Sequence, residues 1–169
     1  ERSVAHAFYT QSKHGLGEII RKDQEELIKN FDKKTKEEVF AWVDDLCTFN
    51  TFEISIPVLR DPDLAPFGKT GIMISCLFEF ELMERIDKAG WTDEFKKRME
   101  TNIIKVFSQS FYKDFDQEIL FGFSTTPLTI NRAVGSSGGA IVGWSFEGEA
   151  PVYNQLLDMT KTAQTPIPN

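Results

Sequence analysis

The chain of 169 residues contains few of the residues on which metal, redox and membrane sites depend. It has two cysteines, Cys47 and Cys76, in apolar surroundings and without a CxxC pair, so we expect reduced, buried thiols. Its two histidines, His6 and His14, have no flanking carboxylate pattern and receive no metal or catalytic role. The longest strongly apolar run, GIMISCLF, is far shorter than the ~20 residues of a membrane-spanning helix.

Basic residues are also scarce, and this narrows the range of partners. Nineteen Lys and Arg stand against 26 Asp and Glu, which gives a net charge of −7. Nucleic acid is therefore not expected as a partner, because phosphate binding requires clustered cations. The sequence has no GxSxG turn and no opposed carboxylates, so no catalytic residue is assigned. The acidic balance is typical of a cytoplasmic protein, which is the location we expect.

The composition otherwise predicts one globular domain over residues 1–169 with an aromatic-rich core. Hydrophobic residues make up 41% of the chain and charged residues 27%, while fifteen phenylalanines favour large, flat side chains in the interior. The chain starts ERSVAHAF without Met and has no signal peptide, which suggests an excised or processed piece.

Three amphipathic segments predict helices. The stretch 15–31 has apolar residues at spacings near three and four, and a second helix begins at Thr35, which forms a capping-box pattern with Glu38. A third and longest helix is predicted over 92–111, after the break at Gly90. A weak helix or turn is expected at 150–159.

Four segments predict strands near 52–58, 71–80, 118–123 and 140–146, of which 71–80 is expected to be central because it is apolar on both faces. Helices are interposed without a repeating βαβ unit. The fold class that follows is α+β, with a mixed or largely antiparallel sheet and helices packed against it.

The most unusual stretch is TTPLTINRAVGSSGGAIVGW, residues 125–144, which contains four of the eleven glycines. These glycines match neither the GxGxxG fingerprint of dinucleotide-binding folds nor a GxxxxGK phosphate loop. Two readings remain open. The glycines supply positive φ in a turn, or they allow backbone to approach a bulky, flat ligand closely.

The run RDPDLAPFGKTGIMIS, followed by an amphipathic helix and then TTPLTINRAVGSSGGAIVGW, resembles in order and spacing the middle-to-late portion of the phytoene-dehydrogenase-like flavin oxidoreductases. This family includes carotenoid desaturases, carotenoid isomerases and retinol saturases. The resemblance covers residues 52–145 well and the N-terminal helices loosely. It implies the substrate-binding domain of a two-domain, FAD-dependent enzyme acting on a long, apolar, unsaturated substrate.

The resemblance also implies where FAD binds, which partners the domain has and which residues contact the substrate. The family's two FAD-binding segments do not match this chain, so FAD is expected in a full-length parent and not on the isolated domain, which should be inactive. The implied partners are the flavin-binding remainder of the parent and an apolar small molecule, with possible peripheral membrane contact of the parent. The residues expected to line the substrate channel are Phe121, Phe123, Thr126, Pro127, Arg132, Gly138 and Gly139.

A second function class stays open beside the flavoenzyme. A non-catalytic module could bind an apolar ligand or a partner protein through an aromatic face. A longer reading frame with a GxGxxG motif after a strand upstream and a glycine-rich segment downstream would exclude this alternative.

Overall fold

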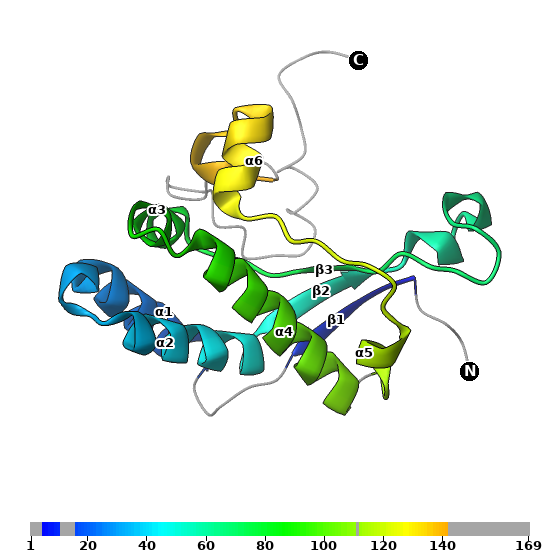
Figure 1. Ribbon diagram of the computed structural model, residues 1–169, viewed down its shortest axis with the longest axis horizontal. Coiled ribbons are helices and arrows are strands. Elements are labelled where there is room, and N and C mark those ends of the chain that lie inside the picture. The colour runs from blue at the N-terminus through cyan, green and yellow to red at the C-terminus, as the bar shows by residue number, and fades with distance from the viewer. Residues whose placement is uncertain (1–4, 11–15, 111, 142–169) are drawn as a thin grey trace, which may run out of the picture.

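The computed structural model describes residues 5–10, 16–110 and 112–141, which form an α+β fold (Figure 1). A small antiparallel sheet lies beside a group of helices, and one long helix crosses a face of the sheet. This confirms the fold class predicted from the sequence.

The sheet has the strand order β1 (His6–Thr10), β2 (Thr51–Ser55) and β3 (Met73–Ser75), with both pairs antiparallel. The register places Ala7, Ile54 and Ile74 in one row across the sheet. Side chains alternate between the two faces of a strand, and the alternation in β2 buries Phe52 and Ile54 while Glu53 is exposed. One face of the sheet therefore belongs to the core.

Six helices accompany the sheet within the described part of the chain, with short 3₁₀ turns between several of them. Their bounds are α1 Leu16–Lys29, α2 Lys36–Thr48, α3 Phe80–Lys88, α4 Thr92–Ser110, α5 Phe115–Glu118 and α6 Pro127–Val134. The 3₁₀ turns are η1 Phe31–Lys33, η2 Pro57–Leu59, η3 Pro62–Leu64 and η4 Ser137–Gly139. In Figure 1, α1 and α2 lie together at one end, α3 above them, and the η2–η3 loop projects at the opposite end.

Helix α4 joins two parts of the core. Near its first turn, Phe95 packs in a cluster with residues of α2 and α3 such as Val43 and Met83. Near its last turn, Phe107 packs against Phe52 of β2, with ring centroids 5.8 Å apart in an edge-to-face arrangement. Burial of each such side chain contributes about 1.5–3 kcal/mol to folding. Helix α4 thus fixes the helical group to the covered face of the sheet.

A polar clamp reinforces the contact between α2 and α4. Arg98 donates to both carboxylate oxygens of Asp44 at 2.6 Å, and Asn102 donates to Asp44 Oδ1 at 2.6 Å. The Arg98 guanidinium also lies over the Phe40 ring, 5.3 Å from its centroid. The Arg98 hydrogen bonds hold the pKa of Asp44 below its usual value against the opposing effect of burial.

Several predictions from the sequence are confirmed. The three predicted helices correspond to α1, α2 and α4. Thr35 and Glu38 form the predicted capping box, in which Glu38 N donates to Thr35 Oγ1 and Thr35 N donates to Glu38 Oε2. The apolar residues spaced along α2 are buried, namely Val39, Phe40, Val43, Leu46 and Cys47.

The strand predictions need correction. The segment 71–80 is not a central strand, because only Met73–Ser75 pairs, at the edge of the sheet, and Phe80 already starts α3. The segment 118–123 is not a strand, since α5 ends at Glu118 and irregular chain follows. Strand 52–58 is shorter than expected, because Pro57 opens a 3₁₀ turn. The central strand is β2, which pairs with the unpredicted β1.

The prediction of a strand at 140–146 falls mostly outside the described residues, as does the helix or turn at 150–159. Ala140 has extended backbone angles but is not part of a strand. Among the described residues, no helix is both long and apolar enough to cross a bilayer.

Candidate functional site

The motif that carries the family resemblance folds into a compact corner built around α6. Thr126 is the N-cap of this helix: its Oγ1 accepts from Thr129 N at 3.2 Å, while Thr126 N donates to Thr129 Oγ1 at 3.3 Å. Pro127 occupies the first helical turn, where its missing N–H and fixed φ suit a helix start. The Thr-Pro pair, predicted from the resemblance to line a channel, therefore begins a helix.

The end of α6 depends on glycine. Gly135 is the C-cap, with a left-handed backbone at φ 71°, and its N–H donates to Asn131 O at 2.8 Å. The chain then turns back through η4, so that Gly139 is buried against the start of the same helix. A β-carbon at position 139 would lie only 2.7 Å from Pro127 Cα. The close approach that glycine permits here is between two segments of the same chain, at Gly139 and Pro127.

Gly138 differs from its neighbour. It also has positive φ, at 57°, but it is exposed and has open space where a side chain would project. Of the predicted site residues, Thr126, Pro127 and Gly139 are thus brought into contact, and Gly138 lies beside them on the surface.

Arg132 lies on α6 and reaches α3 instead of a cavity. It donates from Nη2 to Asp87 Oδ2 at 2.8 Å, and the other carboxylate oxygen of Asp87 accepts from Thr92 Oγ1 at 2.8 Å. The Thr92 hydrogen bond, followed by that of Arg132, holds the pKa of Asp87 below its usual value. Asp87 thereby ties together the end of α3, the first turn of α4 and α6.

The most exposed part of the predicted site is the chain that leads into α6. We call residues 120–123 the apolar segment, since Leu120, Phe121 and Phe123 are 71%, 83% and 81% exposed. It connects α5, which contacts α4, with α6, which contacts α3. Among the residues that the structure describes, the Phe121 and Phe123 side chains are exposed and do not belong to either hydrophobic core cluster.

Two hydroxyl groups on either side of α6 are unsatisfied. Ser124 Oγ and Ser136 Oγ are buried and have no hydrogen-bond partner among the described residues. Buried polar atoms in folded proteins nearly always have partners. This end of the molecule therefore has unmet hydrogen-bonding capacity close to its exposed aromatic side chains.

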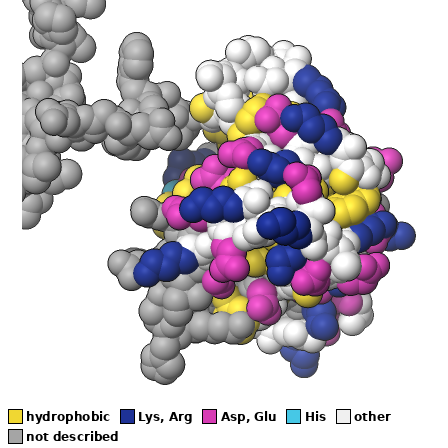
Figure 2. All heavy atoms as spheres, turned by 90° about the vertical axis from the view of Figure 1, so that its left-hand side faces the viewer, with side chains coloured by type: hydrophobic (Ala, Val, Ile, Leu, Met, Phe, Trp, Pro, Cys, Tyr) yellow, Lys and Arg dark blue, Asp and Glu magenta, His cyan; other side chains and the backbone are white. Residues whose placement is uncertain are grey.

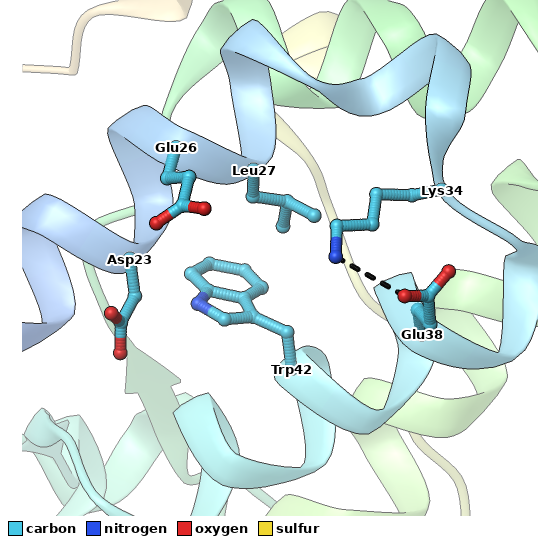
Figure 3. A pocket seen from close by; sticks show the side chains of 6 residues that line it. All are labelled: Asp23, Glu26, Leu27, Lys34, Glu38 and Trp42. Carbon is cyan, nitrogen blue, oxygen red and sulfur yellow. Dashed lines mark hydrogen bonds and ion pairs between the residues drawn. The ribbon is translucent and has the colours of Figure 1, made fainter.

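The hollows on the surface lie elsewhere. One cavity of about 220 Å³ opens between α1 and α2, with Asp23, Glu26 and Leu27 on one side and Trp42 and Glu38 on the other (Figure 3). Its single cation, Lys34, is already paired with Glu38 at 3.1 Å. A second and larger hollow, of about 690 Å³, is lined by residues of η1 and α3 and by Ala89, namely Phe31, Asp32, Glu81, Glu84, Arg85, Lys88 and Ala89. Neither hollow includes any residue of the predicted site.

The helical end of the molecule shows a mixed polar surface. In Figure 2, which faces this end, Lys and Arg side chains are interspersed with Asp and Glu, and no large patch of one sign is visible. Among the described residues, no three His, Cys, Asp or Glu side chains gather in a way that could hold a metal ion.

The corner does not have the geometry of a flavin-pyrophosphate site. A flavin pyrophosphate needs a glycine-rich turn between a strand and the N-terminus of a helix. Here Gly135, Gly138 and Gly139 follow the C-terminus of α6, and Gly139 is closed off by Pro127. This corner therefore offers no cradle for the pyrophosphate.

Sequence reasoning missed one polar pair. His6 Nε2 on β1 lies 2.7 Å from Glu53 Oε1 on β2. The two residues are 47 positions apart, and the strand register that joins them follows from β1, which the sequence pattern did not reveal. A prediction of β1 as the partner of β2 would have found the pair.

Comparison of the chain with protein-family models, with curated proteins and with solved structures gave no match.

Proposed function

We propose that this chain is the substrate-binding domain of an FAD-dependent oxidoreductase acting on a long, apolar, unsaturated molecule. The observation that carries the proposal is the exposure of Leu120, Phe121 and Phe123 next to the corner formed by the family-like motif. Three large apolar side chains within four residues are costly in water, by roughly 25 cal/mol for each Å² of apolar surface. A ligand or covering surface would remove that cost.

The corner supports the proposal by its rigidity. Thr126, Pro127 and Gly139 lock the start of α6 against its own end, and Arg132 ties the helix to Asp87. A binding segment gains affinity when its attachment is already ordered, because less conformational entropy is lost on binding. The corner would thus hold one end of the apolar segment in place for a ligand.

In this proposal FAD is held by the remainder of the parent and supplies the redox chemistry, while this chain contributes one apolar wall and excludes water. Whether the parent desaturates, saturates or isomerises its substrate is a property of the complete active site.

A fluorescent polyene tests the ligand part of the proposal. Diphenylhexatriene emits strongly only in apolar surroundings, so its titration with the purified chain reports binding. We expect saturable binding that the double variant Phe121→Ala/Phe123→Ala weakens by about tenfold, because two apolar contacts are lost. Leu64→Ala is the matched control, since Leu64 is also well exposed, at 62%, but lies in the η2–η3 loop.

Equal losses in the double variant and the control would contradict the assignment to the apolar segment. A chain that binds no polyene but forms a complex through the same phenylalanines would favour the protein-binding module instead. The flavin part is tested separately, by the visible spectrum of the longer protein. A longer protein that purifies without flavin would overturn the oxidoreductase assignment.

A further inference from the structure

The sheet has a second face, opposite to the one on which α4 packs. Helix α4 packs on the face that carries Phe52 and Ile54. The register places His6, Ser55 and Met73 in one row of the opposite face, and Phe8, Glu53 and Ser75 in the next. Phe8 is 67% exposed and Met73 60% exposed, so this face is uncovered where its largest apolar side chains lie.

The uncovered face combines apolar margins with a polar centre. Phe8 stands on β1 and Met73 on β3, while Glu53 and Ser55 lie on the central strand between them. Phe8 and Met73 thus place two exposed apolar side chains on either side of the polar central strand. The arrangement matches a ligand that has both an apolar part and a polar group.

The polar group on the protein side is His6, which two neighbours hold in place. Glu53 Oε1 lies 2.7 Å from His6 Nε2, so the carboxylate fixes the imidazole with its proton on Nε2. The Phe8 ring meets the imidazole edge to face, with centroids 5.3 Å apart. In a neutral imidazole whose Nε2 donates to Glu53, Nδ1 is a hydrogen-bond acceptor.

The ligand must therefore donate a hydrogen bond, and it must not be an anion. An acceptor nitrogen pairs with a hydroxyl or N–H group. The Glu53 carboxylate and the net charge of −7 disfavour carboxylates and phosphates at this face. Phe8 and Met73 favour a flat, aromatic body, because both phenylalanine rings and thioether sulfur contact aromatic rings well.

We propose that the uncovered face of the sheet is a binding site for a neutral, hydroxyl-bearing aromatic ligand, with His6, oriented by Glu53, as the acceptor of its hydroxyl proton. The site is formed by the sheet alone and does not depend on the function proposed for the apolar segment.

Two small probes that differ by one hydroxyl test the proposal on the chain as it stands. We would titrate p-cresol and toluene into the chain with ¹⁵N-labelled histidine, at about pH 8, where histidine side chains are ordinarily neutral. The variant His14→Gln leaves one histidine, so the imidazole signals of His6 are assigned without ambiguity. We expect p-cresol to shift those signals in a saturable manner and to bind about fivefold more tightly than toluene.

Substitutions then separate the hydroxyl contact from the apolar contact. His6→Phe keeps a flat ring without nitrogen and should abolish the preference for p-cresol while toluene binds as before. Phe8→Ala should weaken both probes alike. Glu53→Gln should reduce the preference, since an amide holds the imidazole less firmly than a carboxylate does.

The proposal is overturned if the two probes bind equally well, if p-cresol leaves the His6 signals unmoved, or if His6→Phe retains the preference. Each variant is checked by circular dichroism, and Thr10→Ala serves as a folded control that removes a hydroxyl from the end of the same strand. Loss of polyene binding at the apolar segment, with the p-cresol preference intact, would contradict the proposed function and leave this inference standing.

Discussion

Gly139 lies against Pro127 so closely that a β-carbon at position 139 would stand 2.7 Å from the carbonyl carbon and from Cα of Pro127. Gly139 also has φ at 65°, a region that residues with a side chain rarely adopt. The short distance to Pro127 and the positive φ both restrict position 139, and only glycine satisfies both.

The first prediction concerns this contact. Gly139→Ala should lower the free energy of unfolding by more than about 2 kcal/mol, because backbone strain and overlap with Pro127 add together. Gly138→Ala is the matched control: it carries positive φ but meets open space, so strain alone should cost about 1 kcal/mol. Urea denaturation of the unsubstituted chain and of the two variants measures these free energies of unfolding. Equal losses would mean that α6 and η4 separate easily, contrary to the buried contact.

The second prediction concerns pH. The pKa of Asp44 is lowered in the folded chain, mainly by the hydrogen bonds of Arg98. A lowered carboxyl pKa stabilises the fold above the ordinary pKa of aspartate, and this contribution is lost as the pH falls below about 4. Because both side chains are about 40% exposed, the contribution should be about 1 kcal/mol or less.

Asp44→Asn should flatten the fall in stability at acid pH, as measured by urea denaturation between neutral and acid pH. Glu100→Gln is the control, since it removes a carboxylate from α4 that does not bond to Arg98. If the free energy of unfolding of Asp44→Asn fell with acid pH as steeply as that of the unsubstituted chain, the clamp between α2 and α4 would contribute nothing to stability.

The third prediction concerns the thiols. Burial raises the pKa of Cys47 to about 12 and that of Cys76 to about 11, and the thiolate is the reactive form. Cys47 is buried, with its thiol 3.3 Å from Met99 Sδ, whereas Cys76 is half-buried. With DTNB at neutral pH, Cys76 should therefore react slowly and Cys47 only after unfolding.

The single-thiol variants Cys47→Ser and Cys76→Ser assign the two rates. Rapid reaction of Cys47 in the folded chain would contradict the packing of α2 against α4. Reaction of both thiols at one common rate would point to global unfolding as the only route.

The fourth prediction concerns the tie between α3 and α6. Arg132→Ala should increase amide hydrogen exchange in α6, at Ile130 and Gly135, without changing exchange in α2, because the tie through Asp87 is local. Asp87→Asn should act in the same direction, and the double variant should add little to either change. Full additivity would show that Arg132 and Asp87 act separately, in which case Arg132 would be free for a role toward a ligand.

Helices α1, α2 and α4 were predictable because their signals are local, whereas α3, α5 and α6 were not predicted as helices. The capping box of Thr35 and Glu38 and the apolar spacing of α2 and α4 lie within a few residues of one another. The strands were less predictable, since pairing joins distant segments. Residues 76–79 continue the alternation of β3, but without a partner they form no strand.

The candidate site shows the same limit. The capping of α6 by Thr126 is readable from the Thr-Pro-Leu-Thr order, although the resemblance directed attention to ligand contact instead. The contact of Gly139 with Pro127 and the pairing of Arg132 with Asp87 require the fold, because their partners lie 12 and 45 positions away. His6 became a candidate only when β1 placed it beside Glu53.

The pairing of β1 with β2 has a consequence for how the chain folds. Thr10 and Thr51 face each other across 41 sequence positions, and α1 and α2 lie between them in the chain. Closing such a long stretch costs chain entropy. This cost is smaller when the intervening residues are already helical, because the loop that must close is then effectively shorter. We therefore expect α1 and α2 to form before the sheet closes. Until that moment the edge of β2, with Phe52 and Ile54 beside it, is open to pairing with another chain, so aggregation should compete with folding at this single step.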